Sequence, residues 1–118
     1  MMWIQFCQAK IAYATVTEAE LFYEGSITID KNLLDAVGIV PGQRVEVLNV
    51  NNGQRFDTYT IAGDPGSGVC CLNGPAARLG VVGDLVMILS YVLMEPQEAR
   101  QARTKVIHLN EKNQIKPD

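Results

Sequence analysis

Three side chains in one short segment have the types and the spacing to bind and protonate a small acid. The segment at residues 55–59 reads RFDTY, and a regular strand would put Arg55, Asp57 and Tyr59 on one face. A guanidinium binds a carboxylate through two parallel hydrogen bonds, and a phenol beside it can deliver a proton. The alternative is that Arg55 simply pairs with Asp57 on a solvated strand face.

The dipeptide Gly25-Ser26 interrupts a segment, residues 23–29, that otherwise alternates like a strand. A glycine inside a strand usually marks a bulge, a tight bend or a close backbone approach, and a bulge is the simplest interpretation. The sharper hypothesis is that Ser26 attacks the carbonyl of Gly25, because an unhindered and strained Gly–Ser bond favours conversion of the amide to an ester. Elimination from that ester would leave a dehydroalanine, which hydrolyses to a pyruvoyl group.

Other catalytic residue types are scarce. The chain of 118 residues has one histidine, His108, and three cysteines, Cys7, Cys70 and Cys71. No C-x-x-C or H-x-x-x-H spacing is present, so we expect no metal site, and a Ser/His/Asp triad would depend on His108 alone. Lys10 is a candidate anion ligand or amine nucleophile, and otherwise an exposed strand lysine. An odd cysteine count with an adjacent pair indicates a reducing, cytoplasmic compartment.

The composition excludes several classes of protein. Apolar residues make up 47% of the chain, and ten Lys and Arg face thirteen Asp and Glu, for a net charge of −3. The basic residues are scattered, which argues against a nucleic-acid surface. The longest apolar stretch, residues 85–94, is far shorter than the roughly 20 residues that cross a bilayer, so we expect no membrane association.

Short segments separated by turn residues must position these side chains. We expect strands at residues 3–16, 23–29, 45–48, 55–61, 69–72, 85–94 and 106–109. We expect a helix at 32–37 between an Asp30 cap and a Gly38 stop, a second at 75–79 capped by Asn73 or Gly74, and a third at 96–103. A single turn is expected at 18–21, and a two-residue hairpin turn at Asn52-Gly53. So many strands in a small chain favour a closed β-barrel with helical caps, in a single domain over residues 1–118.

Four motifs occur in a specific order and spacing. They are YEGSITID at residues 23–30, NNGQRFDTY at 51–59, NGPAA at 73–77 and VGDLV at 82–86. Together they closely resemble the pyruvoyl-dependent aspartate 1-decarboxylases of bacteria, and the resemblance extends roughly over residues 6–115.

This resemblance implies a fold, an assembly and a reaction. The fold is a double-psi β-barrel with small capping helices, and the assembly is a homotetramer with active sites between neighbouring subunits. Self-cleavage between Gly25 and Ser26 would give residues 1–25 and a larger fragment, 26–118, that begins with a pyruvoyl group derived from Ser26. This covalent cofactor, with neither metal nor PLP, would form a Schiff base with L-aspartate and accept the electrons released with CO2. The product would be β-alanine, a precursor of pantothenate and coenzyme A.

The resemblance also assigns roles to the charged and phenolic residues. Tyr59 would donate the proton to the decarboxylated carbon. Arg55 would hold a substrate carboxylate, with Lys10 nearby as the second cation.

Further roles carried over by the resemblance concern processing and the pocket wall. Thr58 matches a residue that helps processing and contacts substrate, although flat strand alternation points it away from Arg55, so a twist or bulge is needed. Asn73 and the backbone of Gly74, Pro75 and Ala76 would supply hydrogen bonds at a helix start. Tyr23 would line the pocket just before the cut.

The chain departs from the family pattern at several positions. The family usually has His and then Arg where this chain has Ala12 and Tyr13. Pro75 replaces a small alanine and removes a backbone donor, and Asp57 adds an anion that would repel a dianionic substrate by about 1 kcal/mol. Two alternatives therefore stay open, which are a noncatalytic barrel of the same fold that serves binding or assembly and a pyruvoyl decarboxylase for another small amino acid such as glutamate. Whether a maturation factor assists the cut also stays open.

Overall fold

The computed structural model describes residues 1–117, which form a mainly β structure with short helices. The strands are β1 (Ile4–Thr15), β2 (Glu18–Glu20), β3 (Ser26–Asp30), β4 (Arg44–Asn49), β5 (Arg55–Gly63), β6 (Cys70–Asn73), β7 (Leu85–Met94) and β8 (Lys105–His108). The helices are α1 (Lys31–Val37), the 3₁₀-helix η1 (Gly74–Arg78) and α2 (Pro96–Ala99).

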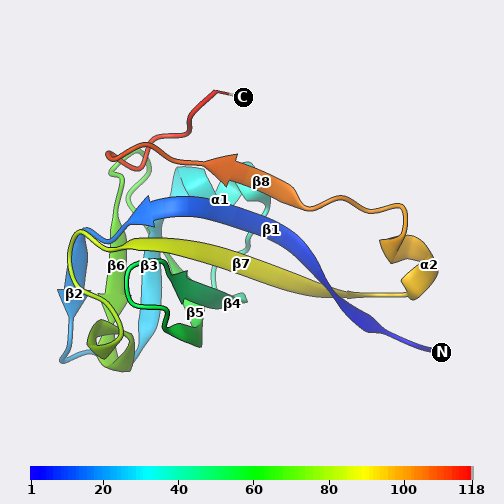
Figure 1. The fold of residues 1–118 in the computed structure, drawn as a ribbon, viewed down its shortest axis with the longest axis horizontal. Coiled ribbons are helices and arrows are strands. Elements are labelled where there is room, and N and C mark those ends of the chain that lie inside the picture. Colours follow the sequence, from blue (N-terminus) through cyan, green and yellow to red (C-terminus); the bar gives the residue numbers. More distant parts are fainter. Residues whose placement is uncertain (118) are drawn as a thin grey trace.

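The strands hydrogen-bond in the order β2-β6-β3-β5-β4-β7-β1-β8. Long antiparallel strands β1 and β7 lie side by side and reach beyond the rest of the molecule toward α2 (Figure 1). β1 leads directly into β2 at the far end of this order, and Val16 and Thr17 between them donate backbone hydrogen bonds to Asp84 and Cys70. The sheet therefore curls back on itself, and the predicted double-psi β-barrel is confirmed.

Alternating apolar residues fill the barrel. Ile27 and Ile29 on β3, Val45 and Val47 on β4 and Ile88 on β7 are at most 1% exposed. Burying a side chain of this size stabilises a fold by about 1.5–3 kcal/mol. This core holds the backbones of β3, β4 and β5 rigidly, and β3 and β5 carry the candidate site residues Ser26, Arg55, Thr58 and Tyr59.

Helix α1 begins and ends where the sequence predicts. The Asp30 carboxylate accepts a hydrogen bond from the Asn32 N–H at 2.8 Å, and Gly38 ends the helix in the left-handed conformation. Asp30 also accepts from the Gly66 and Gly68 N–H groups, at 3.0 and 2.9 Å. One buried carboxylate therefore fixes both the end of β3 and the loop before β6.

Three local predictions are wrong. Residues 18–20 are the strand β2 and not a turn, because their backbone pairs with β6 although all three side chains are exposed. The hairpin loop closes on the backbone pair Asn49–Gln54, so it is longer than two residues, and the Asn49 side chain bonds the N–H groups of Asn51 and Asn52 inside it. The helix expected at 96–103 ends at Ala99.

Among residues 1–117, no helix is both long enough and apolar enough to span a bilayer.

Candidate active site

Ser26 lies at the start of β3, where its side chain is completely buried. Ser26 is 0% exposed, and its backbone pairs with Asn73 of β6. Gly25, just before it, has φ of 126°, a conformation that side chains rarely tolerate. The chain therefore bends at Gly25 and places Ser26 in the interior, and the bend explains why β3 begins at residue 26 and not at 23.

The Asn73 side chain is the hydrogen-bond donor to Ser26. Its Nδ2 lies 2.8 Å from Ser26 Oγ and 2.9 Å from Thr28 Oγ1. The thiol of Cys71 donates to Asn73 Oδ1, with the sulfur 3.2 Å from that oxygen. Asn73 makes no side-chain capping bond to η1, because its amide is turned toward the hydroxyls of β3.

The start of η1 packs against the segment that precedes β3. A Cβ on Gly74 would lie 2.5 Å from the Tyr23 carbonyl oxygen and 2.8 Å from the Gly25 nitrogen, so a larger residue would displace this backbone. Pro75 Cδ lies 3.6 Å from where a Cβ of Gly25 would be. Ala76 is buried in the same turn, and Tyr23 is half-exposed. The residues predicted around the cut thus come together, although Pro75 has no N–H to donate.

Strand β5 brings Tyr59 beside β3. The parallel register pairs Ile27 with Thr60, so Tyr59 lies level with Ser26, one residue earlier in both strands. Tyr59 is 45% exposed, and its phenol is accessible. β5 pairs with β4 without any register shift, so Thr58 lies on the face opposite to Tyr59, and the twist or bulge that would turn it is not found there.

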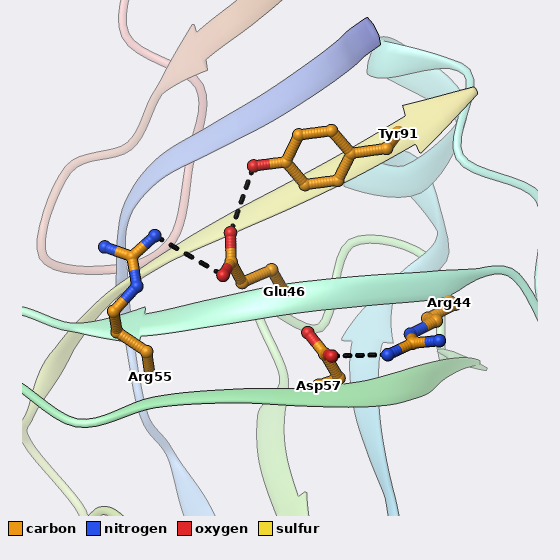
Figure 2. Close-up of polar contacts among 5 residues, drawn as sticks. All are labelled: Arg44, Glu46, Arg55, Asp57 and Tyr91. Atoms are coloured by element: carbon orange, nitrogen blue, oxygen red, sulfur yellow. Dashed lines mark hydrogen bonds and ion pairs between the residues drawn. The ribbon is translucent and has the colours of Figure 1, made fainter. Parts of the chain in front are cut away.

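Arg55 lies in a second region, on the face that β5 shares with β4 and β7. Its Nη2 is 3.3 Å from Glu46 Oε2, and the Tyr91 hydroxyl donates to Glu46 Oε1 at 3.0 Å (Figure 2). On the same face, Arg44 pairs with Asp57 (Figure 2). The alternative pairing of Arg55 with Asp57 is therefore wrong, and the Asp57 carboxylate is largely neutralised by Arg44.

These charged side chains line an open groove with a volume of about 600 Å³. The side chains of Arg55 and Arg44 are 62% and 79% exposed. Exposed ion pairs of this kind contribute roughly 0–1 kcal/mol, so either arginine can exchange its carboxylate partner at little cost. Partial burial, together with the Glu46 carboxylate, raises the pKa of Tyr91, which keeps its hydroxyl a donor to Glu46.

Arg55 does not converge on Ser26 within one chain. Arg55 precedes Tyr59 by four residues, which is about 13 Å along a strand. Its guanidinium leans over β4, whereas Ser26 lies on β3, on the other side of β5.

Lys10 belongs to the second region. It pairs with Leu89 of β7, and Leu89 pairs in turn with Glu46 of β4. Directly paired residues of antiparallel strands share a face, so Lys10 lies on the same rung as Glu46. The two cations predicted from the sequence are thus on one face, apart from Ser26.

The family departures at residues 12 and 13 lie in a bulge of β1. The register with β7 shifts between Ile11 and Ala14, and Tyr13 has a positive φ of 64°. Ala12 is buried and pairs with His108 of β8. The one histidine of the chain therefore lies beside the position where the family usually has a histidine.

Both cysteines of β6 are buried and protonated. Burial raises the pKa of Cys70 to about 12. Burial and then the carboxylates of Glu18 and Glu20 raise the pKa of Cys71. Neither thiol is an activated nucleophile, as expected for strand residues, but a protonated thiol remains a hydrogen-bond donor.

Sequence reasoning missed several members of both regions. Thr28 and Cys71 could have been found, because each lies two residues from a predicted site residue on a strand and so shares its face. Glu46, Tyr91 and Arg44 left no comparable signal, since strand register alone brings them to the groove. Residues 1–117 contain no group of three or more His, Cys, Asp and Glu side chains arranged to hold a metal ion.

Comparison with known proteins shows which sequences this chain is similar to. A sequence model described as aspartate decarboxylase matches residues 2–116. Proteins named aspartate 1-decarboxylase from Carboxydothermus hydrogenoformans and Bacillus subtilis are 54% and 53% identical to the chain, each over 97% of the chain and 90% of the relative. The protein of the same name from Salinibacter ruber is 50% identical over 95% of the chain and 77% of its own length.

Proposed function

The chain belongs to the aspartate decarboxylase family, and from this premise we propose that it converts L-aspartate to β-alanine and CO2 with a pyruvoyl group made from its own Ser26. β-Alanine is a precursor of pantothenate and coenzyme A, so the reaction feeds that biosynthesis. The observation that carries the proposal is the buried Ser26 directly after the bent Gly25, in a chain that matches the family model over nearly its whole length.

The residues around Ser26 fit a group of this kind. A pyruvoyl group at this position supplies a ketone carbonyl that accepts the electron pair released when a substrate loses CO2. Gly25 offers an unhindered carbonyl before Ser26, and Gly74 leaves room for the backbone to bend there. The Asn73 amide directs its neutral N–H donor at Ser26 Oγ, so this hydrogen bond stabilises negative charge that develops on that oxygen.

The proposed cut between Gly25 and Ser26 proceeds in three balanced steps. Ser26 Oγ loses its proton and bonds to the Gly25 carbonyl carbon, and the C–N bond breaks as the nitrogen takes a proton, which leaves an ester. Loss of the Ser26 α-proton then breaks the Cβ–Oγ bond, and Oγ departs in the new Gly25 carboxylate. One water molecule hydrolyses the remaining dehydroalanine to a ketone and ammonia. Asn73 Nδ2 stabilises the negative charge on Oγ when that oxygen loses its proton and again when it departs in the carboxylate.

Substrate binding in this proposal needs two subunits. Arg55 and Lys10 share a face apart from Ser26, and aspartate is too small to bridge the two regions of one chain. A neighbouring copy that presents its charged groove to Ser26 would complete the site, which is the arrangement of a homotetramer with shared active sites. Tyr59, exposed and level with Ser26, would then protonate the carbon that has lost CO2. Thr58 would act in processing, and Tyr23, Gly74, Pro75 and Ala76 would form the wall beside the cut.

We further propose that the enzyme works in the cytoplasm. The adjacent thiols of Cys70 and Cys71 are free and buried, which suits a reducing compartment.

The deciding experiment is the intact mass of the purified chain under denaturing conditions. We expect two fragments, residues 1–25 and residues 26–118, with the larger one blocked to Edman degradation and reduced by borohydride. The Ser26→Ala variant should remain whole and inactive, while Tyr59→Phe should be cut but turn over poorly. Decarboxylation by Ser26→Ala would contradict the mechanism. If the wild-type chain stays whole alone but is cut after incubation with cell extract, a maturation factor is required.

Substrate comparison separates the remaining alternatives. Cleaved protein should release CO2 from L-aspartate much faster than from L-glutamate, measured in parallel with radiolabelled substrates. Faster release from glutamate would identify a pyruvoyl decarboxylase of a different small amino acid. A cleaved tetramer that releases CO2 from neither would identify a noncatalytic member of the fold.

A further inference from the structure

Two hydrogen bonds through the Asn73 amide connect the buried thiol of Cys71 to the hydroxyl of Ser26, and a third joins the same amide to Thr28. Cys71 Sγ lies 3.2 Å from Asn73 Oδ1, and Asn73 Nδ2 lies 2.8 Å from Ser26 Oγ and 2.9 Å from Thr28 Oγ1. Cys71, Asn73 and Ser26 are between 0% and 4% exposed, so water does not compete for these bonds.

The two hydroxyls cannot by themselves decide which way the Asn73 amide faces. A serine or threonine hydroxyl both donates and accepts, so Ser26 and Thr28 could bond to the amide nitrogen or to the amide oxygen. The other end of the amide faces Cys71, and a thiol with its proton favours an oxygen acceptor over an N–H group. The other possible acceptor for the Cys71 thiol is the backbone carbonyl of Leu72. That oxygen is 3.9 Å from the sulfur and is therefore the weaker acceptor.

The direction of the amide matters for the chemistry of Ser26. With Nδ2 toward Ser26, the amide donates to Oγ, and this bond strengthens as negative charge develops on that oxygen. With Oδ1 toward Ser26, the amide would accept a hydrogen bond from the hydroxyl and would repel negative charge that develops on Oγ.

We propose that Cys71 is a positioning residue for self-cleavage, because its thiol holds the Asn73 amide with Nδ2 directed at Ser26 Oγ. This inference rests on the proposed function, since it concerns the cut between Gly25 and Ser26. Cys71 forms no bond to substrate and undergoes no reaction. Burial and the neighbouring acidic side chains of β2 raise the pKa of Cys71, which keeps the proton on the thiol at neutral pH.

The test compares the rate of cleavage in freshly refolded variants, followed by denaturing gel or intact mass. Cys71→Ala and Cys71→Val remove the donor and should slow cleavage about three- to tenfold, the effect of losing one neutral hydrogen bond. Cys71→Ser restores a donor of similar size and should cleave within about twofold of wild type. Cys70→Ala is the matched control, since this neighbouring thiol is equally buried but belongs to the hydrophobic core.

A double-mutant cycle shows whether Cys71 acts through Asn73. In an Asn73→Ala background, the added Cys71→Ala change should have no further effect on the cleavage rate. Thermal melting of each uncut variant shows whether slow cleavage results from loss of the fold. If Cys71→Ala does not fold, the comparison of Cys71→Ser with Cys71→Val tests the role of the thiol.

Several results would overturn the role of Cys71. These are cleavage of Cys71→Ala at the wild-type rate, equal slowing by Cys71→Ser and Cys71→Val, or an undiminished Cys71 effect without Asn73. A wild-type chain that never cleaves, alone or with cell extract, would overturn the proposed function as well, so the two failures are distinguishable.

Discussion

Ser26 and Arg55 lie in regions that use polar groups in opposite ways. Around Ser26 the polar side chains are neutral and buried, and their hydrogen bonds come from strands of the core. Around Arg55 the side chains are charged and mostly exposed, and they pair between the neighbouring strands β4 and β5 (Figure 2). Among residues 1–117, every buried side-chain nitrogen or oxygen has a partner, so the first region is held in one geometry.

This difference suits the two tasks of the proposed function. A cut in the backbone needs atoms held in a strict arrangement, and a buried neutral network provides it without the cost of burying charge. Capture from water of a substrate with two carboxylates needs cations that can exchange one carboxylate for another, and exposed pairs allow this. Variants of the first region should therefore change maturation, and variants of the second should change substrate use.

The largest effect is expected for Asn73→Ala, which removes the donor to Ser26 Oγ. Loss of one such donor typically slows a reaction by about a hundredfold or more. Cleavage rates from intact mass should show this slowing, while Asn52→Ala, an exposed asparagine in the hairpin loop, should cleave normally. Equal cleavage rates for the two variants would contradict the role of Asn73 as the donor to Ser26 Oγ.

The next effect is expected for Arg55→Ala. Hydrogen bonds to charged groups contribute about 1.5–3 kcal/mol, so kcat/KM for aspartate should fall roughly 10- to 150-fold. Self-cleavage should proceed at the wild-type rate, because the hydrogen-bond donor to Ser26 Oγ is Asn73 of the same chain and not Arg55. Arg44→Ala, an arginine on the same face that is paired with Asp57, should change kcat/KM much less. Slow cleavage in Arg55→Ala would show that the two regions are not independent.

Alkaline pH should lower the free energy of unfolding, because the Cys70 thiol is buried. Burial raises the pKa of Cys70 from 9.0 to about 12, so between these values the unfolded chain releases a proton that the folded chain keeps. The contribution of Cys70 is fully present below pH 9 and declines by about 1.4 kcal/mol per pH unit as pH rises toward 12. Urea unfolding of the uncut Ser26→Ala protein at pH 8 and pH 10 measures this decline. A Cys70→Val version should show a smaller decline, and an identical one would contradict the assignment.

The smallest effect is expected for Glu46→Gln. Removing the carboxylate that occupies Arg55 should lower KM for aspartate by up to about fivefold, since an exposed ion pair contributes roughly 0.2–1 kcal/mol. Asp57→Asn should change KM less, because Arg44 already neutralises Asp57. A rise in KM for Glu46→Gln would instead mean that Glu46 orients Arg55 for its substrate.

Local patterns were sufficient for much of the fold. Turn residues and alternation located most strands and helix α1, since the Asp30 cap and the Gly38 stop depend on neighbours in sequence. Strand β2 was not predicted, because its exposed side chains have no apolar pattern and only backbone pairing with β6 makes it a strand. The length of the hairpin loop was not predicted, because it depends on the Asn49 side chain, which accepts a hydrogen bond from the Asn51 N–H inside the loop.

Part of the candidate site could likewise be predicted from local sequence, and part of it needed the tertiary structure. Strand alternation correctly put Arg55 and Asp57 on one face but wrongly paired them, because the nearest opposite charges come from β4. The role of Asn73 as donor to Ser26 also needed the structure, since 47 residues separate the two in sequence.

The sequence by itself determined the family and the barrel class and led to Ser26 as the proposed source of an electrophile, because motifs, turns and alternation are properties of neighbouring residues. Only the tertiary structure decided which partners meet. Strand pairing brings Asn73 to Ser26 and Glu46 to Arg55, and the order of the strands places Asn73 and Ser26 on one side of β5 and Glu46 on the other. The physical reason is that pairing between distant strands is selected by burial of the whole core, and no local segment contains that information.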